Sequence, residues 1–154
     1  MGHVVRLSLD QSLAAGQSLV LQREVAHRLF GVMRLKVGDQ VRVFDGQGPE
    51  RRATVREAGK RTGRIEIGEE TAPFQPPPDL WLLFAPIKKE RTDFIVEKAS
   101  ELGVARIMPV RTDFTSTERI RQDRLKAHAI AAVEQCGGTA LHRIEALQPL
   151  PTRL

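Results

Sequence analysis

The sequence predicts an α/β protein with an all-β N-terminal domain over residues 1–73 and an α/β domain over residues 79–154. Short alternating segments separated by turn residues fill the first part, as in small β domains. In the second part, longer apolar segments alternate with helical patterns. Between the two parts, Pro73–Pro78 includes three consecutive prolines, which favour a stiff and extended linker.

The first domain is expected to be a small antiparallel barrel, because its predicted strands are short and closely spaced. Three segments alternate apolar and polar residues, as half-buried strands do, and a fourth segment does so more weakly. The three are Val4–Leu9, Gln40–Phe44 and Arg64–Gly68, and the weaker one is Arg51–Arg56.

One helix and one tight turn complete this domain. The helix is expected over Gln22–Met33, where Val25, Leu29 and Val32 recur at helical spacing. The turn is expected at Asp45–Gly48, since Asp-Gly after an alternating strand is a strong hairpin signal and glycine supplies a positive φ. The alternative for the same segment is a turn that approaches RNA.

The second domain is expected to alternate strand, helix, strand and helix, an order that implies parallel strands joined by right-handed crossovers. Leu80–Ala85 is apolar throughout, as expected for a strand that is buried on both faces. Arg106–Val110 is the next strand, and Pro109 within it suggests a strand end or an edge position.

The two helices of the second domain are recognised by apolar stripes and by glycines at their ends. The first helix is Arg91–Leu102, with the stripe Ile95, Ala99 and Leu102 and with Gly103 as its C-cap. The second helix begins at a cap on Ser116 or Thr117 and ends near Cys136, before Gly137 and Gly138. Its stripe is Leu125, Ala129, Ala132 and Cys136.

The composition narrows the class of function. The 154 residues carry a net charge of +5, which favours an RNA partner without deciding for one. Aromatic residues make up only 5%, fewer than a module that stacks single-stranded bases would need. The single cysteine, Cys136, suits a cytoplasmic protein, and the longest apolar stretch, Leu80–Ile87, is too short to cross a membrane. The histidines lack the spacing of metal ligands, and no nucleophile or phosphate-loop motif is present, so neither a metal nor a catalytic residue is assigned.

Basic residues supply the candidate RNA contacts. His27, Arg28, Arg34 and Lys36 lie on and just after the first predicted helix, where they either contact phosphates or form a solvated helix face. Lys88 follows the first predicted parallel strand, at the edge where open α/β sheets bind their ligands, although charged residues at such edges are often only solvated.

Four residues near the ends of the two later helices are candidates for shaping a site entrance. Lys98 and Glu101 are three residues apart and can pair weakly, the alternative being an ordinary helix end before Gly103. Glu134 and Gln135 fall in a last helical turn, where the helix dipole opposes a negative charge by under about 1 kcal/mol. The two residues are either an ordinary exposed pair, or Glu134 is kept at this unfavourable position because the function of the protein needs its carboxylate.

The segments taken together resemble the 16S rRNA (uracil-N3)-methyltransferases, a family of the SPOUT class. The resemblance extends over nearly the whole chain and is most specific where Glu97–Val104 follows the earlier Arg34–Asp39 segment. The matching segments are His27–Asp39, Phe44–Gly46, Pro86–Lys88, Asp93–Val104, Ile107–Pro109 and Glu134–Gln135.

The resemblance implies a PUA-like barrel that holds RNA, followed by the first βαβα part of a SPOUT domain. It also implies S-adenosylmethionine as methyl donor, 16S rRNA or the small ribosomal subunit as partner, and a homodimer in the complete protein. Methyl transfer to uracil N3 would require positioning of an accessible base and removal of the N3 proton, or stabilisation of the resulting anion.

The sequence departs from the family in its last part. It reaches Leu154 without the Gly-Pro-Glu-Gly-Gly and Leu-Arg-x-Glu-Thr-Ala segments of the family, and Gly138 and His142 stand where the family usually has Arg and Pro. The cofactor-binding knot is therefore expected to be absent from this chain, and no cofactor-binding residue is assigned. The alternatives to an enzyme are a non-catalytic RNA-binding module and an inactive truncated fragment.

Overall fold

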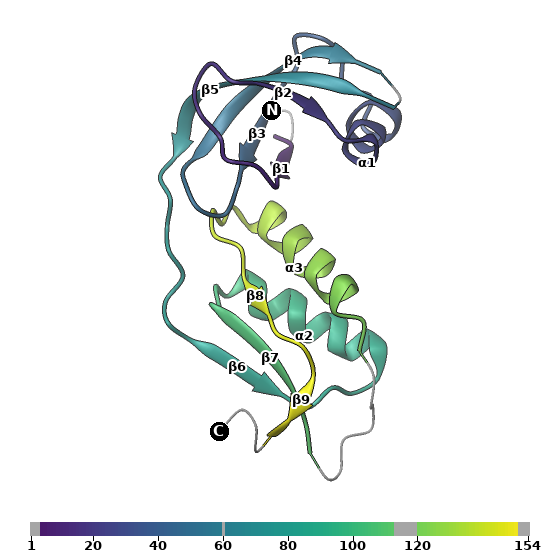
Figure 1. Ribbon diagram of the computed structural model, residues 1–154, viewed down its shortest axis with the longest axis vertical. Coiled ribbons are helices and arrows are strands. Elements are labelled where there is room, and N and C mark those ends of the chain that lie inside the picture. The colour runs from purple at the N-terminus through teal and green to yellow at the C-terminus, as the bar shows by residue number, and fades with distance from the viewer. Residues whose placement is uncertain (1–3, 60, 113–119, 151–154) are drawn as a thin grey trace. The chain divides into compact units, whose positions relative to one another are not determined.

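The computed structural model describes residues 4–59, 61–112 and 120–150. The chain divides into two compact units, residues 1–74 and residues 75–154, and each unit has a hydrophobic core of its own. Figure 1 shows strands in both units, with the two longest helices, α2 (Lys89–Glu101) and α3 (Gln122–Cys136), in the second.

The first unit is built on a five-stranded sheet in the order β1-β3-β4-β5-β2 (Figure 1). All neighbouring strands are antiparallel except β1 and β3, which are parallel, so the expectation of a wholly antiparallel barrel is wrong for this pair. Because β2 and a helix lie between β1 and β3 along the chain, the connection crosses over, as parallel pairing requires. The strands are β1 (Arg6–Ser8), β2 (Ser18–Leu21), β3 (Gln40–Phe44), β4 (Glu50–Ala58) and β5 (Gly63–Ala72).

The core of this unit follows the alternation of its strands. Val41 and Val43 on β3 are fully buried, as are Ile65 and Ile67 on β5. The strand β2 was not predicted, because the exposed Val20 stands between the buried Leu19 and Leu21 and hides the alternation of the segment.

The predicted helix at Gln22–Met33 has a different form. It consists of one α-helical turn, α1 (Arg23–Ala26), which runs directly into a π-helical segment, η1 (His27–Val32). The Met33 N–H donates to the Arg28 carbonyl, five residues earlier, at 3.0 Å. The wider turn rotates Val32 out of the predicted apolar stripe, and its side chain is 65% exposed, whereas Ala26 and Leu29 are buried.

The second unit contains a parallel sheet, as predicted. Strand β7 lies at its centre, with β6 on one side and two short strands, β8 and β9, on the other. Both helices contribute to one core with the sheet, through Val96 and Ala99 of α2, Leu125 and Ala129 of α3 and Ile107 of β7. The strands are β6 (Trp81–Phe84), β7 (Arg106–Arg111), β8 (Arg143–Ile144) and β9 (Gln148–Pro149).

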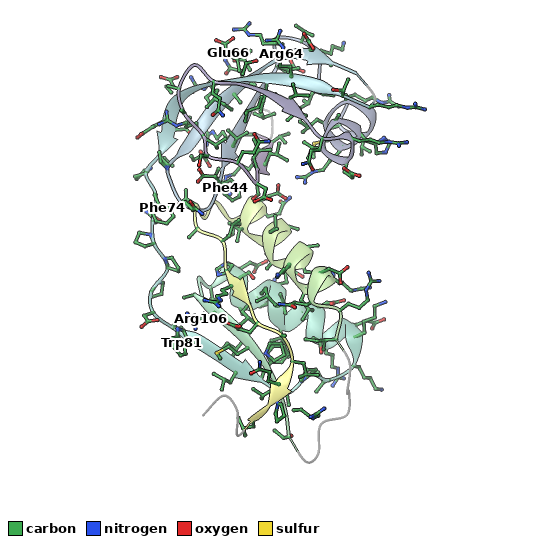
Figure 2. All side chains as sticks on the ribbon, in the orientation of Figure 1. Phe44, Arg64, Glu66, Phe74, Trp81 and Arg106 are labelled. Atoms are coloured by element: carbon green, nitrogen blue, oxygen red, sulfur yellow. The ribbon has the colours of Figure 1, made fainter. Side chains whose placement is uncertain are left out.

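Strand β6 is not buried on both faces, in contrast to the expectation from its apolar sequence. Leu82 and Phe84 pack into the helix-covered core, but Trp81 is 48% exposed and Leu83 is also exposed. The reason is that α2 and α3 cover the same face of the sheet. The Arg106 guanidinium lies 4.7 Å from the centre of the Trp81 ring on the other face, as Figure 2 shows for these two labelled side chains.

Pro109 is inside the central strand rather than at a strand end or at an edge. The N–H groups of Arg143 and Glu145 donate to the carbonyls of Ala105 and Ile107, so alternate residues of β7 face the side of β8. Pro109 follows Ala105 and Ile107 among the residues that face the side of β8. At Pro109 the pairing with β8 has already ended, and the pairing with β9 begins only at Val110. The interruption accommodates a residue that has no N–H to donate.

The helix α2 ends as predicted but buries a different stripe. Gly103 follows the last turn with a φ of 84°, which is the left-handed conformation of a C-cap glycine. The buried residues of α2 are Thr92, Val96, Ala99 and Ser100. Leu102, which was expected on the buried stripe, is 81% exposed.

The helix α3 begins at Gln122, so the expected start at Ser116 or Thr117 lies outside the described residues. Leu125, Ala129 and Ala132 are buried as predicted, whereas Cys136 is exposed. Gly137 ends the helix with a φ of 85°, which confirms the predicted C-terminus.

Candidate functional site

The first candidate site is the basic group on and after the π-helical segment. His27 and Arg28 lie on η1, and the exposed Arg34 and Lys36 follow it within a few residues. Arg34 has a φ of 58°, and it is the one described residue other than glycine with a positive φ. Such backbone conformations cost about 1–3 kcal/mol and are enriched at functional sites. The structure therefore gathers the four predicted phosphate-binding residues on one short segment.

The structure adds two residues to this group that sequence reasoning missed. Arg23 and Arg61 line a hollow of about 400 Å³ together with Glu24 and His27. Arg23 lies four residues before His27, so helical spacing could have identified it. Arg61 comes from the connection between β4 and β5, and no local pattern in the sequence links it to the helix.

The turn at Asp45–Gly48 is a hairpin turn, as predicted. The Asp45 Oδ1 atom accepts hydrogen bonds from the backbone N–H groups of Gln47 and Gly48, both at 2.8 Å. Gly46 has a φ of 81°, and β3 and β4 pair antiparallel on either side of the turn. The Asp45 carboxylate is thus used within the turn itself.

The second candidate site lies in the second unit, near the beginnings of α2 and α3. Lys88 is exposed and immediately precedes α2, after the carboxyl end of β6. A hollow of about 280 Å³ opens beside it. Its lining is apolar at the base and basic at the rim, and consists of Ile87, Lys89, Thr92, Asp93, Ile120, Arg121, Arg124 and Leu125.

An ion pair fixes the rim of this hollow. Arg124 Nη2 donates to Asp93 Oδ2 at 2.8 Å, and His128 Nε2 lies 3.6 Å from the same oxygen. Arg121 donates to the exposed Asp123, and this hydrogen bond lowers the pKa of the Asp123 carboxyl below its usual range. Two of the cations at the rim are therefore already engaged with carboxylates, which leaves Lys89 as the more available one.

The site-shaping candidates do not gather around Lys88. Lys98 lies ten residues further along α2, which corresponds to about 15 Å of helix, and its Nζ pairs with Glu101 Oε2 at 3.1 Å as predicted. Glu134 and Gln135 lie in the last turn of α3, and the two differ: Gln135 is exposed, but Glu134 is only 6% exposed. The interpretation of these two residues as an exposed pair is therefore wrong for Glu134.

A third hollow lies where α2 and α3 end. It has a volume of about 270 Å³, and its lining includes Glu101, Ser100 and Cys136 as well as the proline segment Pro76–Pro78. Glu101 is thus the one site-shaping candidate that lines a described hollow, and it does so at the opposite end of α2 from Lys88.

Two general features concern metals and membranes. Among residues 4–59, 61–112 and 120–150, no group of three His, Cys, Asp or Glu side chains is placed to hold a metal ion. Within the same residues, none of the helices combines the length and the apolar character that crossing a bilayer requires.

Each of the two units matches the sequence profile of a known protein family. The profile of the RNA methyltransferase PUA domain matches residues 21–68, and the profile of the RNA methyltransferase domain matches residues 75–153. The two matches fall in the first and the second structural unit respectively.

Individual relatives agree with these profiles. The chain is 28% identical over 131 residues to the ribosomal RNA small subunit methyltransferase E of Rickettsia conorii, an alignment that covers 84% of the chain and 54% of the relative. The crystal structure of the enzyme of the same name from Neisseria gonorrhoeae, bound to S-adenosylmethionine, has a TM-score of 0.86 at 25% identity and covers 96% of this chain. A methyltransferase from Legionella pneumophila, also with its bound cofactor, has a TM-score of 0.84 at 25% identity and covers 97% of this chain.

The matches extend over only part of these relatives. The chain spans 54% of the R. conorii protein, 63% of the N. gonorrhoeae structure and 64% of the L. pneumophila structure.

Proposed function

Because the chain belongs to the RNA methyltransferase family, we propose that it acts in the S-adenosylmethionine-dependent methylation of ribosomal RNA. The finer proposal is that the methyl acceptor is N3 of a uridine in 16S rRNA, with the complete protein acting as a homodimer on the small ribosomal subunit. The observation that carries the proposal is the combination, in one chain, of a PUA-type unit bearing a basic cluster with a parallel-sheet unit of the methyltransferase family.

The first unit is suited to holding RNA by its backbone. His27, Arg28, Arg34 and Lys36 are donors on one segment, and contacts of such groups to phosphates fix the position of a strand without reading its sequence. The shortage of aromatic residues, at 5%, argues against base stacking as the main source of affinity.

Among the hollows in the described part of the second unit, the one beside Lys88 does not suit S-adenosylmethionine. The hollow beside Lys88 has about 280 Å³, whereas small-molecule sites usually have about 300–1,000 Å³. Its rim also carries the cations Lys89, Arg121 and Arg124, which would repel the sulfonium of the methyl donor. We therefore assign no donor-binding residue and derive no catalytic step from these side chains.

Lys88 and its neighbours can still bind the RNA that carries the methyl-accepting base. Lys88 and Lys89 lie where the carboxyl end of β6 leads into the start of α2, and cations there would attract an RNA phosphate. A positive group near the acceptor base would also stabilise the uracil anion that forms when N3 loses its proton.

A chimera tests this function. The chain is joined to the remaining C-terminal segment of the R. conorii relative, so that it replaces the matching part of that protein. We expect N3-methyluridine in 16S rRNA after incubation with S-adenosylmethionine, measured by mass spectrometry of nucleosides, with the intact relative as the control. A chimera that folds and binds S-adenosylmethionine but leaves the rRNA unmethylated would contradict the proposal.

A second candidate function is a non-catalytic RNA-binding module, and the poor fit of the hollow beside Lys88 to S-adenosylmethionine favours it. Calorimetric titration of the 154-residue chain with S-adenosylmethionine separates the two functions. Micromolar binding would exclude the module, whereas no heat, together with RNA binding that weakens steeply with salt, would favour it.

A further inference from the structure

The hollow around Arg23, His27 and Arg61 has an unbalanced positive charge. Among the residues that the structure describes, none of these three side chains takes part in a hydrogen bond or an ion pair. Glu24 is the one carboxylate among the described residues of the lining, so the two arginine cations outnumber it by one. An anionic group from outside would therefore be stabilised in this hollow.

The position of His27 depends on a glycine. A Cβ atom at Gly31 would lie 3.0 Å from His27 Nδ1 and 3.3 Å from Cε1, so the imidazole packs directly over the backbone of Gly31. Gly31 is not among the glycines with a positive φ. The structural reason for a glycine there is thus the space that the imidazole occupies.

A second glycine holds the helical segment next to the loop that carries Arg61. A Cβ atom at Gly63 would lie 2.9 Å from Phe30 Cζ and 2.8 Å from the Glu57 carbonyl, so the Phe30 ring packs against the first residue of β5. Figure 1 shows α1 beside the end of the β4–β5 hairpin accordingly. This contact brings Arg61 to the hollow, although it is far from His27 in the sequence.

We propose that this hollow binds one phosphate of a single-stranded RNA backbone, with Arg23 and Arg61 as permanent cations and the His27 ring as a hydrogen-bond donor. The proposal rests on the RNA-binding role proposed above and names one phosphate contact within it. A phosphate fits because the described residues of the lining are polar or charged, and none of them is a Phe, Tyr or Trp on which a base could stack.

The test measures binding of a fluorescein-labelled oligouridine RNA to the full chain by fluorescence anisotropy across a range of salt concentrations. For Arg61→Gln we expect the slope of log affinity against log salt to become less steep by about 0.7, as for one lost contact to a single strand. Arg56→Gln removes the same charge from the same unit, at an exposed residue that pairs with Glu66, and should leave the slope unchanged. His27→Ala should weaken binding by removing the ring donor, and Gly31→Ala should weaken it by displacing the imidazole without removing a charged group.

Each outcome supports or overturns a separate claim. If the oligouridine does not bind the unmodified chain at all, the RNA-binding function itself fails. If it binds, but Arg61→Gln behaves like Arg56→Gln and His27→Ala binds as tightly as the unmodified chain, only the phosphate site is wrong. Inorganic phosphate or polyglutamate that competes as strongly as the RNA would overturn the assignment to an RNA backbone, whereas weak competition supports it.

Discussion

Arg6 Nε lies 2.7 Å from Glu50 Oε2, and this ion pair ties β1 to β4 across the intervening strand β3. Glu50 is only 3% exposed, and its other oxygen accepts a hydrogen bond from the Thr71 hydroxyl at 2.6 Å. The Arg6 guanidinium also lies 4.6 Å from the centre of the Phe44 ring. A buried carboxylate that is satisfied in this way is costly to disturb, because removal of its charge breaks the ion pair with the largely buried Arg6.

Glu50→Gln should therefore lower the free energy of unfolding of the first unit by about 3 kcal/mol. The measurement is urea denaturation followed by far-ultraviolet circular dichroism. The matched control is Glu69→Gln, which removes a carboxylate from an exposed pair with Arg52 on the same sheet and should cost under about 1 kcal/mol. Equal effects of the two substitutions would contradict the role assigned to Glu50.

Gly63→Ala should also destabilise the first unit, by about 1–3 kcal/mol, because the new methyl group meets both Phe30 and the backbone carbonyl of Glu57. Gly48→Ala is the control, since its methyl group would meet the Asp45 carboxylate only at an ordinary 3.7 Å. Thermal denaturation of the two variants checks the difference. A Gly63→Ala protein as stable as Gly48→Ala would mean that Phe30 is not held against β5.

Arg34 allows backbone strain to be separated from charge. Arg34→Gly and Arg34→Ala both remove the guanidinium, but only glycine adopts a φ of 58° without strain. We expect the glycine variant to be more stable than the alanine variant by about 1 kcal/mol, and both to bind RNA with a slope against salt that is less steep by about 0.7. If the two variants differed in RNA affinity but not in stability, the strain would not lie at this residue.

Arg124→Gln should destabilise the second unit by about 1–3 kcal/mol, because Asp93 is largely buried and loses the donor that lies 2.8 Å away. Arg121→Gln removes an equal charge from the fully exposed pair with Asp123 and should have almost no effect on stability. Hydrogen exchange of amides in α3 measures the local stability in both variants. Equal protection in the two would show that the Asp93 pair does not stabilise the helix.

Much of the fold could be predicted from local patterns. Gly103 and Gly137 end their helices because each adopts the left-handed conformation that glycine tolerates, and Asp45 forms the turn that its sequence indicates. Parallel pairing in the second unit followed from the alternation of strands and helices, and the Lys98–Glu101 pair followed from helical spacing. In each case the decisive interaction lies within a few residues of the signal.

The remaining features depend on tertiary contacts. An apolar strand such as Trp81–Phe84 has the same sequence pattern whether helices cover one face of its sheet or both. The π-helical turn at His27–Val32 differs from an α-helix by the choice of a carbonyl one residue further away. Arg61 joins His27 only because Phe30 packs on Gly63, and the burial of Glu134 likewise depends on packing that helical spacing does not encode.

The placement of Trp81 in the second unit has a practical consequence. The chain contains one tryptophan and no tyrosine, so the first unit has no strong intrinsic fluorophore. The fluorescence of Trp81 therefore reports on the second unit alone. An unfolding curve recorded by this fluorescence would not detect the effects of substitutions at Glu50, Gly63 or Arg34 on the stability of the first unit. A tryptophan introduced at the buried Phe44 would allow the unfolding of the first unit to be followed by fluorescence.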